Sequence, residues 1–130
     1  MDKEAVFKKL RFDANKTALI LNAPQNYIDL LEGISFDSSP KENTEYDFIQ
    51  IFGYQQDELE NLVKSVGHFR KYDGLFWACY PKGTGKIKSN IKRETVWSAL
   101  ALIGLDTVTQ IAIDETWSAL RARPSEMVGK

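Results

Sequence analysis

The stretch Gly74–Lys88, GLFWACYPKGTGKIK, is the most informative in the chain. It opens with an apolar run, Leu75 to Tyr80, which stops at Pro81-Lys82 and passes into a loop rich in glycine and lysine. Such a run is typical of a buried parallel strand, whose end delivers the following loop to the edge of an α/β sheet, where ligands usually bind. The stretch therefore indicates a place for a site, but no motif in the chain fixes a reaction.

Other segments extend this pattern in both directions. The segments Thr17–Asn22 and Tyr46–Tyr54 predict two more strands, and an amphipathic helix is expected after each of the three. Thr107–Ile113 predicts a fourth strand, and Trp117–Arg123 predicts a strand that returns beside it. Strands that alternate with helices imply right-handed crossovers and a parallel sheet covered on both faces. We expect a three-layer α/β/α Rossmann-like sandwich, mostly parallel, with a C-terminal antiparallel strand. The last two strands are expected to add an antiparallel edge to the sheet.

The chain of 130 residues is expected to form a single α/β domain, residues 1–130. Its core spans about 17–124, with a peripheral N-terminal helix at 2–12 and a frayed C-terminal tail at 125–130. Tyr72-Asp73-Gly74 predicts a turn before the third strand.

Composition excludes several classes of function. A formal net charge of −1 gives no reason to expect affinity for nucleic acid or membranes. The single cysteine, Cys79, excludes an internal disulfide and a multi-cysteine metal site, and no metal is expected. Residues 1–15 lack the apolar core of a signal peptide, and no apolar run approaches the roughly 20 residues that span a bilayer. A reducing cytoplasm is the expected location.

The carboxyl ends of parallel strands share one edge of a sheet, so the residues that follow the strands gather there. The candidate ligand-binding residues at this rim are Asn22, Tyr54, Lys82, Asp114 and Trp117. Lys82 can place a charge on a small anionic ligand, such as a nucleotide or phosphate, and Trp117 can stack on a ring. Asn22 and Tyr54 can orient a ligand through hydrogen bonds. The alternative stays open that Trp117 packs the hairpin, Lys82 is solvated and Asn22 caps a helix.

Two further groups of basic residues are weaker candidates for an anion. Gly83–Lys86 lacks the spacing of a Walker A loop, because Tyr80 stands where a glycine is needed and Ile87 follows the lysine. Lys86 and Lys88 can still bind an anion loosely. Arg121 and Arg123 share one face of the last strand, where they can clamp an anion or protect an exposed edge from aggregation.

Few patterns in the sequence point to catalysis. Asp114-Glu115 is either a carboxylate pair or a turn, and His68, the only histidine, follows a helix without a nucleophile motif to serve. Cys79 lies inside a buried strand, which favours a packed, inert thiol. These patterns leave any catalytic residue unknown, and no cofactor is expected.

The order of the last elements resembles the Rossmann-like methyltransferase fold, which also closes with a hairpin that tucks in an antiparallel strand. That resemblance implies an adenosyl cofactor held by a glycine-rich loop after the first strand. Here the loop is Asn22-Ala23-Pro24, without glycine before Gly33, and no acidic ribose-binding residue ends a clear second strand. The resemblance therefore implies a truncated fold whose cofactor site is lost or rebuilt.

More closely, the chain is similar to a family of small uncharacterised bacterial proteins, a domain of unknown function, from about Thr17 to Pro124. The motifs that carry this resemblance are Leu21–Pro24 (LNAP), Trp77–Lys82 (WACYPK) and Asp114–Arg121 (DETWSALR). It implies a bacterial cytoplasmic setting and no activity.

The sequence favours a non-catalytic binding or protein-interaction module. The alternative is an enzyme or sensor that binds a small anionic ligand at the rim. A homodimer through the edge strand, with the arginines or Trp117 at the contact, is a third possibility.

Overall fold

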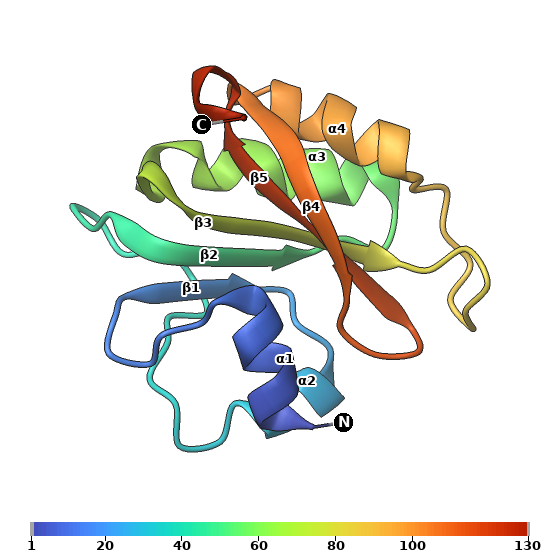
Figure 1. Ribbon diagram of the computed structural model, residues 1–130, viewed down its shortest axis with the longest axis horizontal. Coiled ribbons are helices and arrows are strands. Elements are labelled where there is room, and N and C mark those ends of the chain that lie inside the picture. Colours follow the sequence, from blue (N-terminus) through green and yellow to red (C-terminus); the bar gives the residue numbers. More distant parts are fainter. Residues whose placement is uncertain (1, 130) are drawn as a thin grey trace.

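The computed structural model describes residues 2–129. In chain order its elements are α1 (Lys3–Leu10), β1 (Ala18–Leu21), α2 (Gln25–Leu30), β2 (Tyr46–Phe52), α3 (Gln56–Val66), η1 (Gly67–Phe69), β3 (Arg70–Pro81), α4 (Arg93–Ala101), β4 (Leu105–Ala112), β5 (Trp117–Pro124) and η2 (Ser125–Met127). The five strands form one sheet in the order β1-β2-β3-β5-β4 (Figure 1). The α1 helix falls within the helix expected at 2–12, and Lys130, in the expected tail, lies outside the described residues.

The predicted parallel core is confirmed. β1 pairs with β2 and β2 pairs with β3, both in parallel. β5 runs antiparallel to β3 and to β4, so β4 points the same way as the first three strands. Four strands therefore deliver their carboxyl ends to one edge of the sheet, and the predicted mostly parallel α/β sandwich with one antiparallel strand is correct.

The last two strands lie at one side of the sheet, as expected, but the exposed edge expected for Arg121 and Arg123 is wrong. β5 lies between β3 and β4, and β4 is the edge on that side (Figure 1). Residues 117–120 are all buried, because the strand is paired on both sides and an apolar core covers each face of the sheet. Arg121 and Arg123 therefore lie inside the sheet and do not protect an exposed edge.

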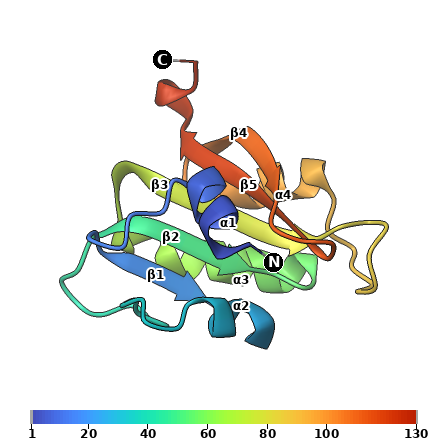
Figure 2. The ribbon, with the colours of Figure 1, turned by 60° about the horizontal axis from the view of Figure 1, so that its bottom comes forward.

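Two apolar cores, one on each face of the sheet, hold the layers together. Alternate residues of each strand point to opposite faces, so Ile20 faces α1 and α2 whereas Leu19 and Leu21 face α3 and α4. Figure 2 shows α1 in front of the sheet and α3 behind it. Burial on both faces explains why the parallel strands are continuous apolar runs.

The expected turn at Tyr72-Asp73-Gly74 is instead part of β3. Asp73 has a φ of 56°, and the register of β3 against β2 shifts between Tyr46 and Phe48. The segment is thus an irregularity inside a long strand, and aspartate is one of the residues that adopt this backbone conformation most easily.

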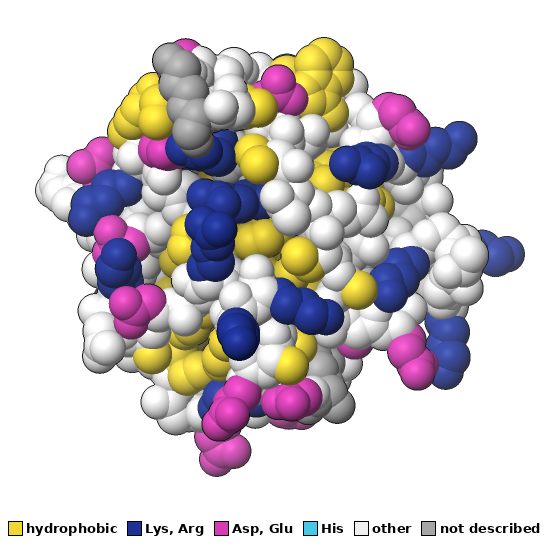
Figure 3. Space-filling model, viewed as in Figure 1, with side chains coloured by type: hydrophobic (Ala, Val, Ile, Leu, Met, Phe, Trp, Pro, Cys, Tyr) yellow, Lys and Arg dark blue, Asp and Glu magenta, His cyan; other side chains and the backbone are white. Residues whose placement is uncertain are grey.

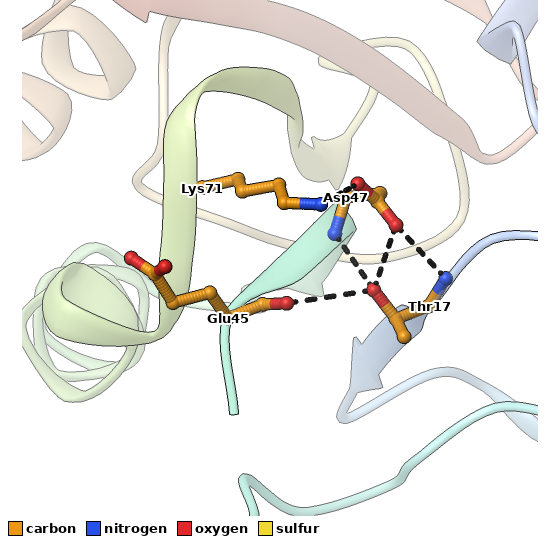
Figure 4. A network of polar contacts seen from close by, with 4 residues as sticks. All are labelled: Thr17, Glu45, Asp47 and Lys71. Carbon is orange, nitrogen blue, oxygen red and sulfur yellow. Dashed lines mark hydrogen bonds and ion pairs between the residues drawn. The ribbon is translucent and has the colours of Figure 1, made fainter. Parts of the chain in front are cut away.

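A polar network joins β1, β2 and β3 where these strands begin (Figure 4). One carboxylate oxygen of Asp47 accepts hydrogen bonds from the backbone N–H and the hydroxyl of Thr17, at 3.2 and 2.9 Å. Its other oxygen lies 2.8 Å from the Nζ of Lys71. The hydrogen bond from Lys71, aided by those from Thr17, lowers the pKa of Asp47, so the network stabilises the ionised form.

Replacing Asp47 by asparagine is expected to lower the free energy of unfolding at neutral pH by about 1–2 kcal/mol, because the charged hydrogen bonds are lost. A lowered pKa gives stability that is present above the unfolded pKa, about 3.9, and is lost as the pH falls through the folded pKa. Urea titrations of both proteins should therefore differ at pH 7, and the difference should shrink as the pH falls below about 3.9. A difference that does not change with pH would contradict the assignment.

Among residues 2–129 no helix is long and apolar enough to cross a membrane.

Candidate functional site

The residues that follow the parallel strands meet at one edge. Asn22 comes directly after β1, and its Nδ2 donates to the carbonyl of Phe52, the last residue of β2, at 2.7 Å. Gly53 N–H donates to the carbonyl of Cys79 in β3, at 3.0 Å, and Lys82 N–H donates to the carbonyl of Thr116 at 2.8 Å. The turns after β1, β2, β3 and β4 are thus tied to one another.

Asn22 makes the turn that a glycine would ordinarily make. Its φ is 62°, in the left-handed region, which asparagine enters at little cost. The loop then enters α2 through Pro24. The glycine-rich loop that the fold resemblance implied is therefore absent after β1. In its place Asn22 makes the turn, and its side chain donates a hydrogen bond to the neighbouring strand β2.

Trp117 lies under the rim and does not face solvent. Only 2% of it is exposed, and its ring makes edge-to-face contacts with Phe52 and Tyr54, at centroid distances of 5.1 and 5.0 Å. It packs the hairpin, so the idea that it stacks on a ligand or forms a dimer contact is wrong. Tyr54 is half-buried, and burial together with the nearby Glu58 carboxylate raises the pKa of its hydroxyl.

Asp114 organises the loop between β4 and β5. Its Oδ1 accepts hydrogen bonds from the backbone N–H groups of Thr116 and Trp117, both at 2.8 Å. The sequence allowed either a turn or a catalytic carboxylate pair at this position, and these hydrogen bonds are those of a turn. They also fix the orientation of the Asp114 carboxylate. Asp114 and Glu115 both border a cavity that residues of α1 and α2 also line.

A cavity of about 860 Å³ lies between α1, α2 and the β4–β5 loop. Its lining residues are Asp2, Ala5, Val6, Lys9, Asn26, Asp29, Leu30, Ile113, Asp114, Glu115 and Thr116. Four of these are carboxylates and one is a lysine, which gives the wall a formal charge of −3. Such a wall repels the small anionic ligand predicted for this edge and attracts a cation, so the predicted ligand charge is corrected.

Of the five rim candidates, only Asp114 borders this cavity. Asn22, Tyr54 and Lys82 follow the strand ends but do not line it, and Lys82 is half-buried. The residues that α1 and α2 contribute were missed, because the position of α1 on the sheet depends on contacts distant in sequence. Trp77 Nε1, for example, donates to the carbonyl of Leu10 at 3.0 Å.

A buried polar chain supports α2 beneath the rim. The hydroxyl of Tyr27 donates to Oε1 of Gln50 at 2.9 Å, and Nε2 of Gln50 lies 3.4 Å from Sγ of Cys79. Burial raises the pKa of the Tyr27 hydroxyl, and it raises the pKa of the Cys79 thiol to about 12. The thiol therefore stays protonated at neutral pH, as expected of an inert, packed cysteine.

The three weaker anion candidates do not lie together. Lys86 and Lys88 are exposed in the loop after β3, and the carbonyl of Lys88 accepts a hydrogen bond from Gln55. Arg121 instead lies in β5, opposite Trp77 of β3. Within residues 2–129 no group of three or more His, Cys, Asp or Glu side chains is placed to hold a metal ion.

Comparison with solved structures identifies the architecture. The chain is similar to magnesium protoporphyrin IX methyltransferase from Synechocystis PCC 6803, solved with bound S-adenosylmethionine, with a TM-score of 0.62 and 10% identity over 95% of this chain and 78% of that one. The chain has the Rossmann-like methyltransferase fold. The chain is also similar to an S-adenosylmethionine-dependent methyltransferase from Clostridium acetobutylicum ATCC 824, with a TM-score of 0.61 and 10% identity over 93% of this chain and 89% of that one. A SAM-dependent methyltransferase from Aquifex aeolicus matches with a TM-score of 0.59 and 12% identity, over 93% of this chain and 88% of that one.

No protein-family model matches the chain. No curated protein matches it either. The resemblance to the family of small bacterial proteins therefore stays a prediction.

The preference for a non-catalytic module is corrected by these structures. Chains that share the fold over nearly the whole of this one are described as methyltransferases. The alternative, an enzyme with a ligand site at the carboxyl-end edge of the sheet, agrees better with them. At 10–12% identity the likeness establishes the fold, and the function has to be argued from the site.

Proposed function

We propose that this chain is an enzyme that binds a small cationic ligand in the acidic cavity, and that this ligand is an adenosyl sulfonium donor of methyl groups. The observation that carries the proposal is the charge of the cavity wall, four carboxylates against one lysine, at the carboxyl-end edge of a methyltransferase-type sheet. The volume of about 860 Å³ lies within the range of small-molecule sites, ~300–1,000 Å³.

The residues present fit such a donor by charge and size. Asp29, Asp114 and Glu115 offer carboxylates to a positive centre, and Leu30 and Ile113 add apolar surface. When bound, the donor supplies an electrophilic methyl group. The turn after β1 departs from the glycine-rich loop of the fold's cofactor site, so in this proposal recognition depends on the acidic wall.

The roles of the chain's own groups follow from their positions. Asp114 is held in one orientation by two backbone N–H groups, so its carboxylate is preorganised to face a cation. Glu115 is exposed and lines the same cavity, so it can accept a proton from an incoming acceptor group.

S-adenosylmethionine is expected to raise the melting temperature more than S-adenosylhomocysteine, which lacks the sulfonium charge. A positive charge beside carboxylates near a protein surface is worth on the order of 1–2 kcal/mol, which predicts roughly tenfold tighter binding of the sulfonium. Thermal-shift titration and calorimetry with both compounds measure this preference.

Matched variants locate the effect. Asp114→Asn keeps the side-chain oxygen that organises the turn but removes the charge, and Glu115→Gln removes a second charge. Both should reduce the preference for the sulfonium, whereas Glu42→Gln, at an exposed position outside the cavity, should leave it unchanged. Equal affinity for the two compounds, or none for either, would overturn the proposal.

Three broader expectations remain proposals. Membership of the small bacterial family and a cytoplasmic location rest on the sequence alone. A homodimer through the edge of the C-terminal hairpin would have to use β4, because β5 lies inside the sheet. A concentration-dependent mass measured by light scattering tests the dimer.

A further inference from the structure

Three arginines lie on one side of the sheet near the end of α1. Arg11 is the C-cap of α1, and Arg121 and Arg123 share one face of β5. Arg121 is the register partner of Trp77, whose indole donates to the carbonyl of Leu10, the residue before Arg11. Figure 3 shows Lys and Arg side chains gathered on this side of the molecule. The fold therefore brings together cations that are distant in sequence.

These arginines differ in what they bind. Arg123 is held by Asp73 through two hydrogen bonds, Nε to Oδ1 at 2.9 Å and Nη2 to Oδ2 at 2.8 Å. The side chains of Arg11 and Arg121 have no hydrogen-bond or ion-pair partner among residues 2–129, and Nε of Arg121 is buried. A buried donor without an acceptor is costly, so its retention points to an acceptor that comes from outside the chain.

Electrostatics agrees with this geometry. Burial, and then the neighbouring charges of Arg11 and Arg123, lower the pKa of Arg121. Like charges held together in this way repel one another, and an anion would relieve the repulsion.

A hollow of about 200 Å³ lies beside the cluster. Arg11 and Asp73 border it, with Asp13, Lys16, Asp47, Phe48, Gly74 and Leu75. With Arg121, Arg123 and Lys71, the partner of Asp47, the region holds five cations and three carboxylates, a net charge of +2. Asp47 and Asp73 are already paired, so Asp13 is the carboxylate left to oppose an incoming anion.

We propose that Arg11 and Arg121, beside the Arg123–Asp73 pair, bind the phosphate group of a phosphate monoester in this hollow. A monoester carries about −1.5 to −2 charges at pH 7, which matches the net charge of the region. Guanidinium groups donate in a planar fork that suits phosphate oxygens.

A nucleic acid fits this hollow less well. Binding along a phosphate backbone typically uses about 6–10 contacts, whereas three arginines flanked by Asp13 and Asp47 can serve a single group. The site is separate from the acidic cavity, and it does not depend on the function proposed above.

Calorimetry and ³¹P NMR with inorganic phosphate and with phenyl phosphate, in low-salt buffer, test the proposal. The unmodified protein should bind at least one of them, and Arg121→Met should weaken binding at least tenfold. Arg93→Gln, an exposed arginine at the start of α4, is the matched control and should change nothing. If phenyl phosphate binds more tightly, the ligand of the site is a phosphate ester. If inorganic phosphate binds more tightly, the ligand of the same site is the free anion.

A second readout separates a ligand role from a structural one. In phosphate-free buffer Arg121→Met should melt at a higher temperature than the unmodified protein, because it removes a desolvated charge without a partner, but phosphate should no longer stabilise it. If this variant does not fold, Arg11→Asn serves instead, since asparagine tolerates the φ of 57° at this position, and it should also weaken binding at least tenfold. No binding of either compound at millimolar concentration, or undiminished binding by the variants, would overturn the proposal.

Discussion

Replacing Trp77 by alanine is expected to lower the free energy of unfolding by about 3–5 kcal/mol, a large part of the roughly 5–15 kcal/mol that a domain of this kind has. Trp77 is 1% exposed and packs in the core beneath α1. Its indole N–H also holds the end of α1 through the carbonyl of Leu10. Since α1 supplies one wall of the acidic cavity, the same change should weaken ligand binding.

Circular dichroism during urea unfolding measures the loss without relying on tryptophan fluorescence. Trp97→Ala is the matched control, because Trp97 is 48% exposed on α4, and it should cost about 1 kcal/mol or less. Trp77→Phe keeps most of the packing but removes the hydrogen bond, so it should lie between the two. Similar losses for Trp77→Ala and Trp97→Ala would contradict the role given to Trp77.

Replacing Gly53 by alanine is expected to cost about 2–3 kcal/mol. A Cβ at this position would lie 2.7 Å from the Cβ of Leu59 and 3.1 Å from its Cα, so the backbone of α3 would have to move. Gly53 follows β2 at the rim, where α3 crosses closest to the strand end. The glycine is therefore needed for space, because its φ lies outside the left-handed region.

Gly83→Ala is the control for this substitution. Nothing lies within 4 Å of the Cβ that it would add, so its effect should stay within about 0.5 kcal/mol. A thermal melt of the two variants side by side makes the comparison. If Gly53→Ala and Gly83→Ala melt at the same temperature, Gly53 does not pack closely against α3.

Much of the sheet could be predicted from the sequence, because burial on both faces leaves a local signal. The runs at Ala18–Leu21 and Leu75–Tyr80 are uninterrupted and apolar, and both are strands in the parallel core. The position of β5 could not be predicted in the same way, since either strand of the hairpin could have paired with β3. One signal was available: Trp117–Leu120 is small or apolar without the alternation of an edge strand.

The site was only partly predictable. The rim residues follow the strands directly, so Asn22, Tyr54 and Lys82 could be located from strand ends alone. The cavity also needs α1, which is placed by a contact between Leu10 and Trp77, 67 residues apart in sequence. The acidic character of the cavity wall could not be predicted for the same reason, because Asp2 and Asp29 join Asp114 only after α1 and α2 have docked.

A cationic ligand is expected to bind in the acidic cavity between α1, α2 and the β4–β5 loop. Two-dimensional ¹H–¹⁵N NMR during titration with S-adenosylmethionine measures this binding residue by residue. We predict that the largest shift changes fall on the amides of Asn26, Asp29 and residues 113–116, and that S-adenosylhomocysteine needs a higher concentration to produce them. Shift changes centred on Arg11 and Asp73, or spread over the surface without saturation, would contradict the claim.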